Sequence, residues 1–255
     1  MRRRPLLAGI GALGTVSLAG CLGAESVRLS LGETANFDDG RSLTVSSPTV
    51  QKSIVASHAA FLSLEREADS QFVVVDVTGT AEFEPSSFAL ERDGDVAEPP
   101  SSYPAVRPVA RECRDTCVPI VVPVEAVDEA AVAYRSDGKR AFWELDEETV
   151  ARLSRTPELE LREAVIGERD GDIELAFTVE NVGERDGVFR GLVAPEDVAD
   201  VEEPFAFPVP VGETVTEAFV PRELTHYDPD DAEIHNSVSA ETRYFSVSYA
   251  GRPSV

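Results

Sequence analysis

The sequence has few cations, and almost all of them are arginines. Its 255 residues include 23 Lys+Arg against 47 Asp+Glu, which gives a formal net charge of −24, and Lys52 and Lys139 are the only lysines. A phosphate backbone or an anionic lipid surface repels a chain of this charge that has no basic patch, so nucleic acid is not an expected partner. The composition instead suits concentrated salt, where the Debye length shortens to roughly 3 Å at 1 M and self-repulsion is screened.

The sequence also lacks an apolar run long enough to span a membrane. The run from Leu6 to Leu18 is too short to cross a hydrocarbon core of roughly 30 Å as a helix, and no later stretch reaches the roughly 18 residues required. Three arginines at 2–4 precede the run, and the tetrad Leu18-Ala19-Gly20-Cys21 ends it. This order predicts that residues 1–20 are a cleaved export signal.

Both ends of this segment resemble known export signals. The arginine pair ahead of Pro5-Leu6-Leu7 resembles the twin-arginine class, which exports folded proteins. Leu18-Ala19-Gly20-Cys21 resembles the lipobox of prokaryotic lipoproteins, which implies cleavage before Cys21 and a diacylglycerol-type anchor on its thiol. Two acyl chains hold a protein at the extracytoplasmic face of the membrane without basic residues. The alternative is a cleaved secretory signal with an unmodified Cys21.

Short segments of alternating hydrophobicity predict an all-β protein. In Asp172–Glu180 the apolar residues share one face and most polar residues the other, as in a half-buried antiparallel strand, and 159–166 is the expected hairpin partner. Tyr244–Tyr249 alternates in the same way. Prolines in the alternating run 205–211 predict an edge strand, because proline cannot donate to a ladder.

The first half of the chain has the same pattern. Phe72–Val77 and Val118–Val124 are nearly continuous apolar runs, which are typical of buried strands. The segments 131–135 and 139–145 predict a hairpin whose core includes Trp143. Asp-Gly pairs, a strong signal for tight hairpin turns, occur at Asp39-Gly40, Asp93-Gly94, Asp137-Gly138, Asp170-Gly171 and Asp186-Gly187.

Two segments are less regular. The region 54–69 fits either a short helix or a strand, and we favour a strand at 61–64 that pairs with 71–78. Asp146 is placed to cap a helix over Glu147–Ser154, which Thr156-Pro157 ends. We therefore expect the following organisation: 1–20 signal peptide, 21–26 lipidated N-terminus and linker, 27–147 first β-sandwich, 148–156 short helical linker, 157–250 second β-sandwich and 251–255 tail.

Each expected sandwich resembles an immunoglobulin-like family. In 27–147, Gly32-Glu33, Gln71–Val77 and the turn 136–138 ahead of 141–145 resemble the telokin-like domains of unknown function in haloarchaeal-type lipoproteins. In 157–250, Val179–Gly183, Asp186–Phe189 and Val211–Thr214 resemble adhesion-type domains of archaeal surface proteins. The resemblance implies two immunoglobulin-like sandwiches that bind, space or present other molecules, with no catalytic residues and no cofactor.

The pair Cys113 and Cys117 is the sharpest cluster of reactive side chains. Because an exported protein meets an oxidising compartment, we expect a disulfide between them that restrains the loop before Val118. Free thiols, a redox dithiol or a thiolate metal site are the alternatives. The short loop limits the entropic gain to about 2 kcal/mol or less.

A second cluster holds both histidines of the second half. His226, Asp228 and His235 are plausible zinc or copper ligands, but they lack a tight pair spacing, and a solvated loop before Ser237 is the simpler interpretation. The sequence has no Gly-x-Ser-x-Gly elbow and only three histidines. We therefore expect a lipid-anchored binding, adhesion or spacer protein and not an enzyme. Its expected partners are the membrane and a surface protein or solute. The alternative is a metal- or solute-binding lipoprotein that uses the His226/His235 loop.

Overall fold

The computed structural model describes residues 26–58, 61–80, 83–96, 116–136, 138–195, 203–222, 232–239 and 242–249. These residues are nearly all β, as the alternating pattern predicts. The short helices in the described part are the 3-10 turn η1 (Pro85–Ser87) and α1 (Glu147–Arg152), and none there is long and apolar enough to cross a bilayer. The expected signal peptide, Cys21 and the tail lie outside the described residues.

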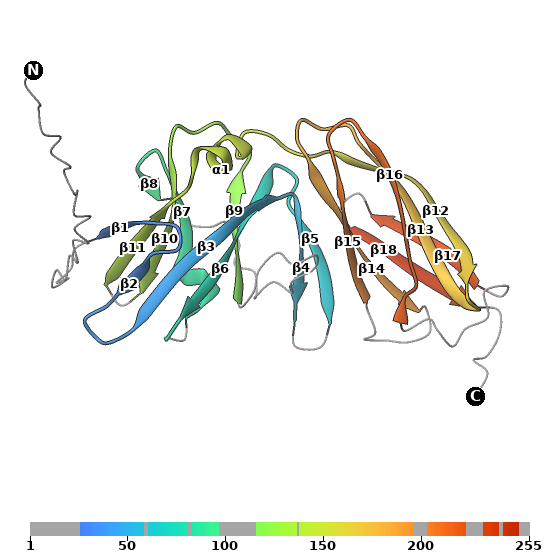
Figure 1. The fold of residues 1–255 in the computed structure, drawn as a ribbon, viewed down its shortest axis with the longest axis horizontal. Coiled ribbons are helices and arrows are strands. Elements are labelled where there is room, and N and C mark those ends of the chain that lie inside the picture. Colours follow the sequence, from blue (N-terminus) through green and yellow to red (C-terminus); the bar gives the residue numbers. More distant parts are fainter. Residues whose placement is uncertain are drawn as a thin grey trace, which may run out of the picture.

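Two sheets of the first half pack face to face on the left of Figure 1. One has the order β1 (Val27–Ser30), β11 (Lys139–Glu144), β10 (Ala130–Ser136), β7 (Phe88–Arg92), β8 (Asp95–Val96). The other has the order β2 (Thr34–Asn36), β3 (Ser42–Gln51), β6 (Ser70–Gly79), β9 (Thr116–Pro123). Side chains from both sheets form one core, in which Trp143 and Tyr134 are almost fully buried. The predicted 131–145 hairpin and the apolar runs of β6 and β9 are confirmed.

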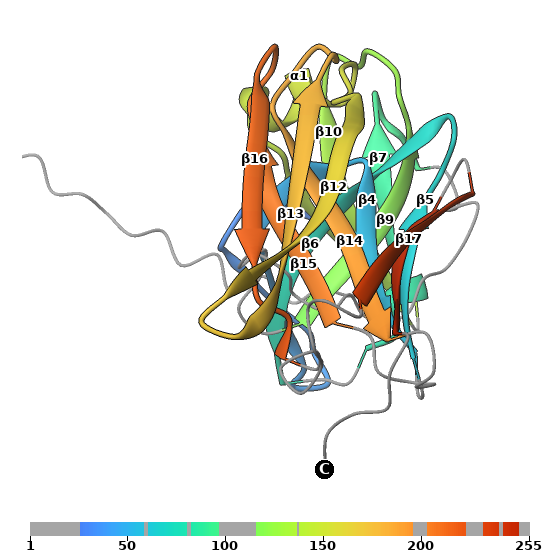
Figure 2. The ribbon, with the colours of Figure 1, turned by 90° about the vertical axis from the view of Figure 1, so that its right-hand side faces the viewer.

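The second half repeats this arrangement on the right of Figure 1. One sheet has the order β12 (Leu159–Arg169), β13 (Asp172–Asn181), β16 (Thr214–Phe219), which Figure 2 shows from its outer side. The other has the order β15 (Glu203–Val209), β14 (Gly187–Pro195), β18 (Thr242–Tyr249), β17 (Ala232–Ser239). Phenylalanines dominate the core between them, and Phe177 stacks on Phe205 with ring centroids 4.7 Å apart. The expected edge strand is confirmed in β15.

The region 54–69 forms a hairpin, but its pairing differs from the prediction. Strands β4 (Ser53–Ser57) and β5 (Leu62–Arg66) pair with each other in a separate two-stranded sheet. The predicted pairing of 61–64 with 71–78 is wrong, because β3 and β9 already occupy both edges of β6. The hairpin lies between the two sandwiches in Figure 1 and contacts β14 and β18.

The helix prediction is confirmed. Asp146 adopts an extended conformation, and its side chain accepts a hydrogen bond from the Thr149 amide at 2.7 Å, as an N-cap does. Among the described strands, β1–β11 pair only with one another, as do β12–β18. The domain limits at 147 and 157 remain a prediction.

Some of the Asp-Gly pairs form the predicted tight turns and one does not. Asp93-Gly94 and Asp170-Gly171 have positive φ at both residues, as tight hairpin turns require. Asp186-Gly187 is not such a turn, and the hairpin predicted there is wrong. Gly187 instead opens β14, where a Cβ would come within 2.6 Å of the Pro157 side chain. This glycine is therefore needed for the close approach of the segment that joins the two halves.

Candidate functional site

A cleft lined with basic side chains lies where the β4–β5 hairpin meets the second sandwich. A cavity of about 360 Å³ adjoins a smaller one of about 50 Å³, with which it shares Lys52, Pro157, Val188 and Arg190. The larger volume is in the range of roughly 300–1,000 Å³ typical of small-ligand sites. Asp186 is the one acidic residue among the described residues that line them, against five cations: Lys52, Arg66, Arg152, Arg185 and Arg190.

Strand alternation explains why two of these arginines line the cleft from its two sides. On β14, Phe189 and Val193 point into the sandwich core, so Arg190 and Leu192 lie on the opposite face. On β5, Leu62 and Leu64 share a face with Arg66. The leucines of both strands meet in one apolar cluster with Val55 and Ala206. An arginine on each strand therefore lies at the edge of this apolar contact.

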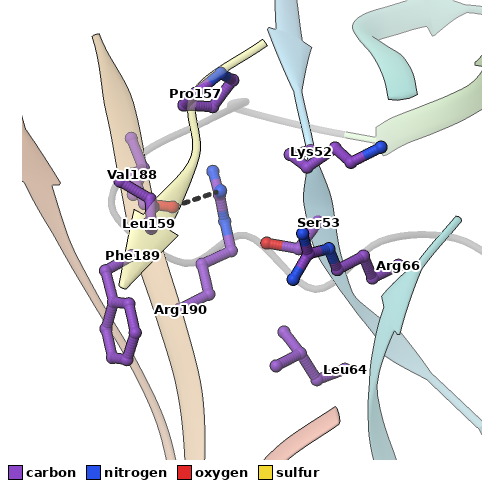
Figure 3. Close-up of a pocket in the computed structure, with 9 residues that line it drawn as sticks. All are labelled: Lys52, Ser53, Leu64, Arg66, Pro157, Leu159, Val188, Phe189 and Arg190. Carbon is purple, nitrogen blue, oxygen red and sulfur yellow. Dashed lines mark hydrogen bonds between the residues drawn. The ribbon is translucent and has the colours of Figure 1, made fainter. Parts of the chain in front are cut away.

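The close-up of the smaller cavity shows how these groups are directed (Figure 3). Arg66 extends from the hairpin into the space with Ser53 close by, Arg190 lies along the opposite wall with its guanidinium group turned toward the Val188 carbonyl, and the ammonium group of Lys52 points away. Arg190 is only 4% exposed, and its Nη1 donates to the Val188 carbonyl at 3.2 Å. The two guanidinium groups thus line one small space from opposite walls.

Lys52 ties the start of the hairpin to the next turn. Its Nζ donates to the carbonyl oxygens of Glu67 and Ala68 at 2.8 Å and of Ser70 at 2.6 Å. Burial, followed by the positive charge of Arg66, lowers the pKa of Lys52 below its ordinary value. Its role in the cleft is therefore to add positive charge, because its three donors are already used.

Arg185 belongs to a turn that Asn181 holds in place. The buried Asn181 donates from Nδ2 to the carbonyls of Arg185 at 2.8 Å and of Val209 at 2.9 Å. Arg185 donates to the Arg155 carbonyl at 2.8 Å, and burial together with the charges of Arg152 and Arg190 lowers its pKa to about 10. The guanidinium group is still charged near neutral pH, in a field of like charges.

Gln51 adds an unsatisfied polar atom to the wall of the larger cavity. The residue is 6% exposed, its Nε2 donates to Thr49 Oγ1 at 2.7 Å, and its Oε1 has no hydrogen-bond partner among the described residues. Buried polar atoms without partners are rare in folded proteins. A ligand in the cavity would lie beside this amide.

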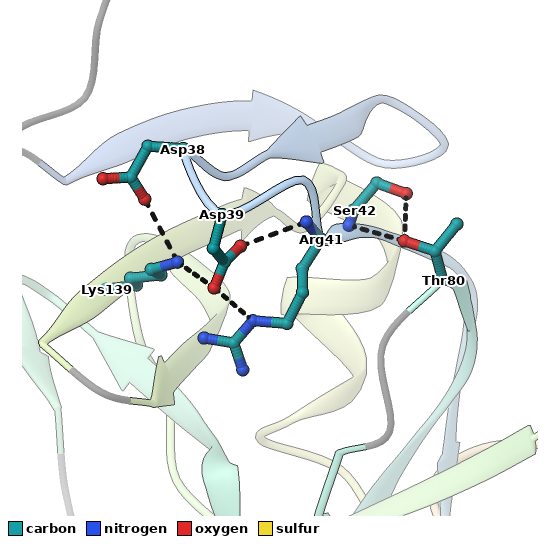
Figure 4. Close-up of polar contacts among 6 residues, drawn as sticks. All are labelled: Asp38, Asp39, Arg41, Ser42, Thr80 and Lys139. Carbon is teal, nitrogen blue, oxygen red and sulfur yellow. Dashed lines mark hydrogen bonds and ion pairs between the residues drawn. The ribbon is translucent and has the colours of Figure 1, made fainter.

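Lys139, the second lysine of the chain, lies among carboxylates, unlike Lys52. Lys139 Nζ contacts Asp38 Oδ1 at 3.1 Å and also Asp39, whose carboxylate accepts from Arg41 Nε at 2.6 Å (Figure 4). Lys139, followed by Arg41, lowers the pKa of Asp39 below its ordinary value. Here carboxylates surround the cation, whereas the acceptors of Lys52 are neutral carbonyls.

The predicted cysteine pair is only half within the described part. Cys117 begins the buried part of β9, is 1% exposed and is not a free thiol. Cys113 lies outside the described residues. The Cys113–Cys117 disulfide therefore remains a prediction.

The predicted metal ligands are likewise split. His226 and Asp228 lie outside the described residues. His235 lies in β17, in register with Ser246 of β18, so the expectation of a loop up to Ser237 is wrong from Ala232 onward. Backbone pairing with β18 runs from Ala232 to Ser239, so this segment is a strand and not a loop. Among the described residues, no group of three metal-ligating side chains comes together.

The cleft could not be predicted from the sequence. Its cations come from separate segments of both halves, and no spacing rule connects them. Comparison with protein-family models, curated proteins and solved structures gives no match for the chain. The case for function therefore depends on the residues themselves.

Proposed function

We propose that the chain is a lipid-anchored, extracytoplasmic binding protein of a salt-adapted cell, which binds a solute in the cleft between its two sandwiches. The observation that carries this proposal is the cavity of about 360 Å³ lined by cations from both halves of an acidic chain. Two immunoglobulin-like domains, an intact Cys113–Cys117 disulfide and an anchor at Cys21 are parts of the same proposal.

Binding fits this site better than catalysis does. Asp186 Oδ1, from the one carboxylate in the described lining, accepts from the Val211 amide at 2.9 Å and so has a structural partner. The remaining polar groups are hydrogen-bond donors of fixed charge together with a side-chain amide and hydroxyls, which hold and orient a solute.

A cleft-filling substitution tests the binding proposal. Val188 lines both cavities, so Val188→Trp should fill them, whereas Val165→Trp places the same side chain on β12 at a site that is 42% exposed. We expect a low-molecular-mass extract of the cell envelope to raise the melting temperature of the full chain and of the Val165 variant but not that of the Val188 variant. Equal shifts in all three proteins, or no shift, would contradict a ligand site here.

The anchor is tested separately. Intact mass measurement of protein extracted from its native membrane should show loss of residues 1–20 and a lipid adduct on Cys21. Cys21→Ser should release the protein from the membrane fraction. An unmodified Cys21 in membrane-bound protein would refute the anchor and leave the binding site unaffected.

A further inference from the structure

Positive charge is concentrated in the cleft although the chain as a whole is acidic. Five of the 23 Lys+Arg residues line it, in a protein with 47 Asp+Glu. Within the described residues, Arg152 pairs with Glu148 at 2.5 Å on the exposed side. The hydrogen bonds of Lys52 and Arg185 go to neutral oxygens. Among the described residues that line the cleft, five carry positive charge and only Asp186 carries negative charge, an imbalance that favours an anionic ligand.

The electrostatic strain of the site supports this interpretation. Burial, followed by neighbouring positive charges, lowers the pKa of both Arg185 and Lys52. A bound anion would favour the charged form of each group and would relieve this repulsion. The electrostatic potential in the cleft is therefore positive, as an anionic ligand requires.

The geometry limits the kind of anion. Guanidinium groups are planar forks that match the paired oxygens of phosphate, sulfate and carboxylate groups, and two such groups, from Arg66 and Arg190, line the smaller cavity from its two sides (Figure 3). The Ser53 hydroxyl, which lines the same space, is a further donor. Chloride offers no set of directed acceptor oxygens to two forks, so the abundant monovalent anion of a salt-adapted cell is a poor match.

We propose that the cleft binds a small oxyanion of two negative charges, such as a phosphate or sulfate group, between Arg66 and Arg190. This inference rests on the proposed function, because it names the ligand class of the same cleft. Screening is strong in molar salt, where the Debye length is roughly 3 Å, so only directly contacting and partly buried charges retain an attraction. Arg190, at 4% exposure, is such a charge.

Calorimetric titration tests the ligand class. The full chain carrying Cys21→Ser is titrated in molar KCl with inorganic phosphate, sulfate and acetate. We expect saturable one-to-one binding of phosphate or sulfate and at least about tenfold weaker binding of acetate, which has one charge. No saturable binding of phosphate or sulfate, or equal binding of acetate, would overturn the inference.

Matched variants locate the site. Arg66→Gln and Arg190→Gln should each weaken binding at least about tenfold, since each removes a charge-assisted pair of donors. Arg162→Gln is the control, because this exposed guanidinium group on β12 pairs with Glu180 at 2.6 Å. If Arg190→Gln impairs folding, as judged by circular dichroism, the more exposed Arg66 still decides the test. Unchanged affinity in Arg66→Gln, or equal weakening in Arg162→Gln, would refute the location.

This result is separable from that of the proposed function. If a neutral solute from the envelope extract stabilises the wild-type chain but not the Val188→Trp variant, the cleft binds a solute and the anionic class is wrong. If Val188→Trp leaves the binding of every tested solute unchanged, both the proposed solute site and the proposed oxyanion class are wrong.

Discussion

Replacement of Gly183 by alanine should destabilise the protein strongly. A Cβ at this position would lie 2.2 Å from the Glu158 amide nitrogen and 2.7 Å from the Thr156 carbonyl oxygen. Both are main-chain atoms, so no side-chain rotation can relieve the clash. The joining segment 156–158 therefore has to move away from the turn that follows β13.

The size of the effect follows from what that movement breaks. The Val182 amide donates to Glu158 at 2.8 Å, and the Glu184 amide donates to Thr156 at 3.0 Å. Each hydrogen bond contributes about 0.5–1.5 kcal/mol net, and an overpacked site adds about 1–3 kcal/mol of strain. We expect Gly183→Ala to lower the free energy of unfolding by about 2–6 kcal/mol, a large part of the roughly 5–15 kcal/mol typical of a folded protein.

Thermal unfolding in molar KCl, followed by circular dichroism, measures this loss. A decrease of about 3 kcal/mol corresponds to roughly 6–12 °C for a chain of this size. Gly167→Ala on β12 is the matched control, because a Cβ there would lie 3.9 Å from its nearest neighbours on Glu174, an ordinary contact. If Gly183→Ala stays within about 0.5 kcal/mol of the wild type, or if Gly167→Ala loses as much stability, the close approach of 156–158 does not require a glycine at 183.

Three further substitutions test separate parts of the fold. Trp143→Phe removes the indole donor to the Glu33 carbonyl at 2.9 Å and leaves a void in the core, so it should cost about 1–3 kcal/mol in urea unfolding; no loss would mean that this bond is unimportant. Asp146→Ala should cost about 0.5–2 kcal/mol at neutral pH. The Thr149 amide lowers the pKa of Asp146, so its contribution is present above the ordinary pKa of 3.8 and is lost as the pH falls through the lower folded value. The cost of Asp146→Ala should therefore shrink in acid, and a pH-independent cost would contradict this origin. Lys139→Gln should raise the pKa of Asp39 toward its ordinary value in a carboxyl NMR titration, because Lys139 is the main cause of its lowering; an unchanged titration would exclude that cause.

Local periodicity was sufficient for most strands. The alternation in β13 and the apolar run in β6 correctly predict which side chains are buried. A strand buried on one face alternates apolar and polar residues, and a strand buried on both faces is almost continuously apolar. The helix at α1 was equally predictable, since the cap and the following acidic residues act within one turn. These are properties of neighbours in the chain.

Pairing and close approach were not predictable in the same way. The β5 segment has the pattern of a strand, but its partner depends on which edges of β6 are free, and that is decided by β3 and β9 from distant parts of the chain. Asp186-Gly187 has the composition of a tight turn, yet Gly187 is needed for its contact with Pro157. In both cases the tertiary arrangement overrides a correct local preference.

The cleft concentrates positive charge in a chain that is otherwise acidic, and concentrated salt limits how such a site can bind. An evenly acidic surface is favourable in concentrated salt because mobile cations screen it, but the same salt weakens any binding site built from exposed charges. A basic site must then be partly withdrawn from solvent and must use directed donors instead of long-range attraction. Arg190 meets both conditions, since its strand places it on the face that the β4–β5 hairpin covers, opposite Arg66. The β4–β5 hairpin, which pairs with neither edge of β6, therefore forms one wall of the cleft, and the proposed binding depends on its separate position between the sandwiches.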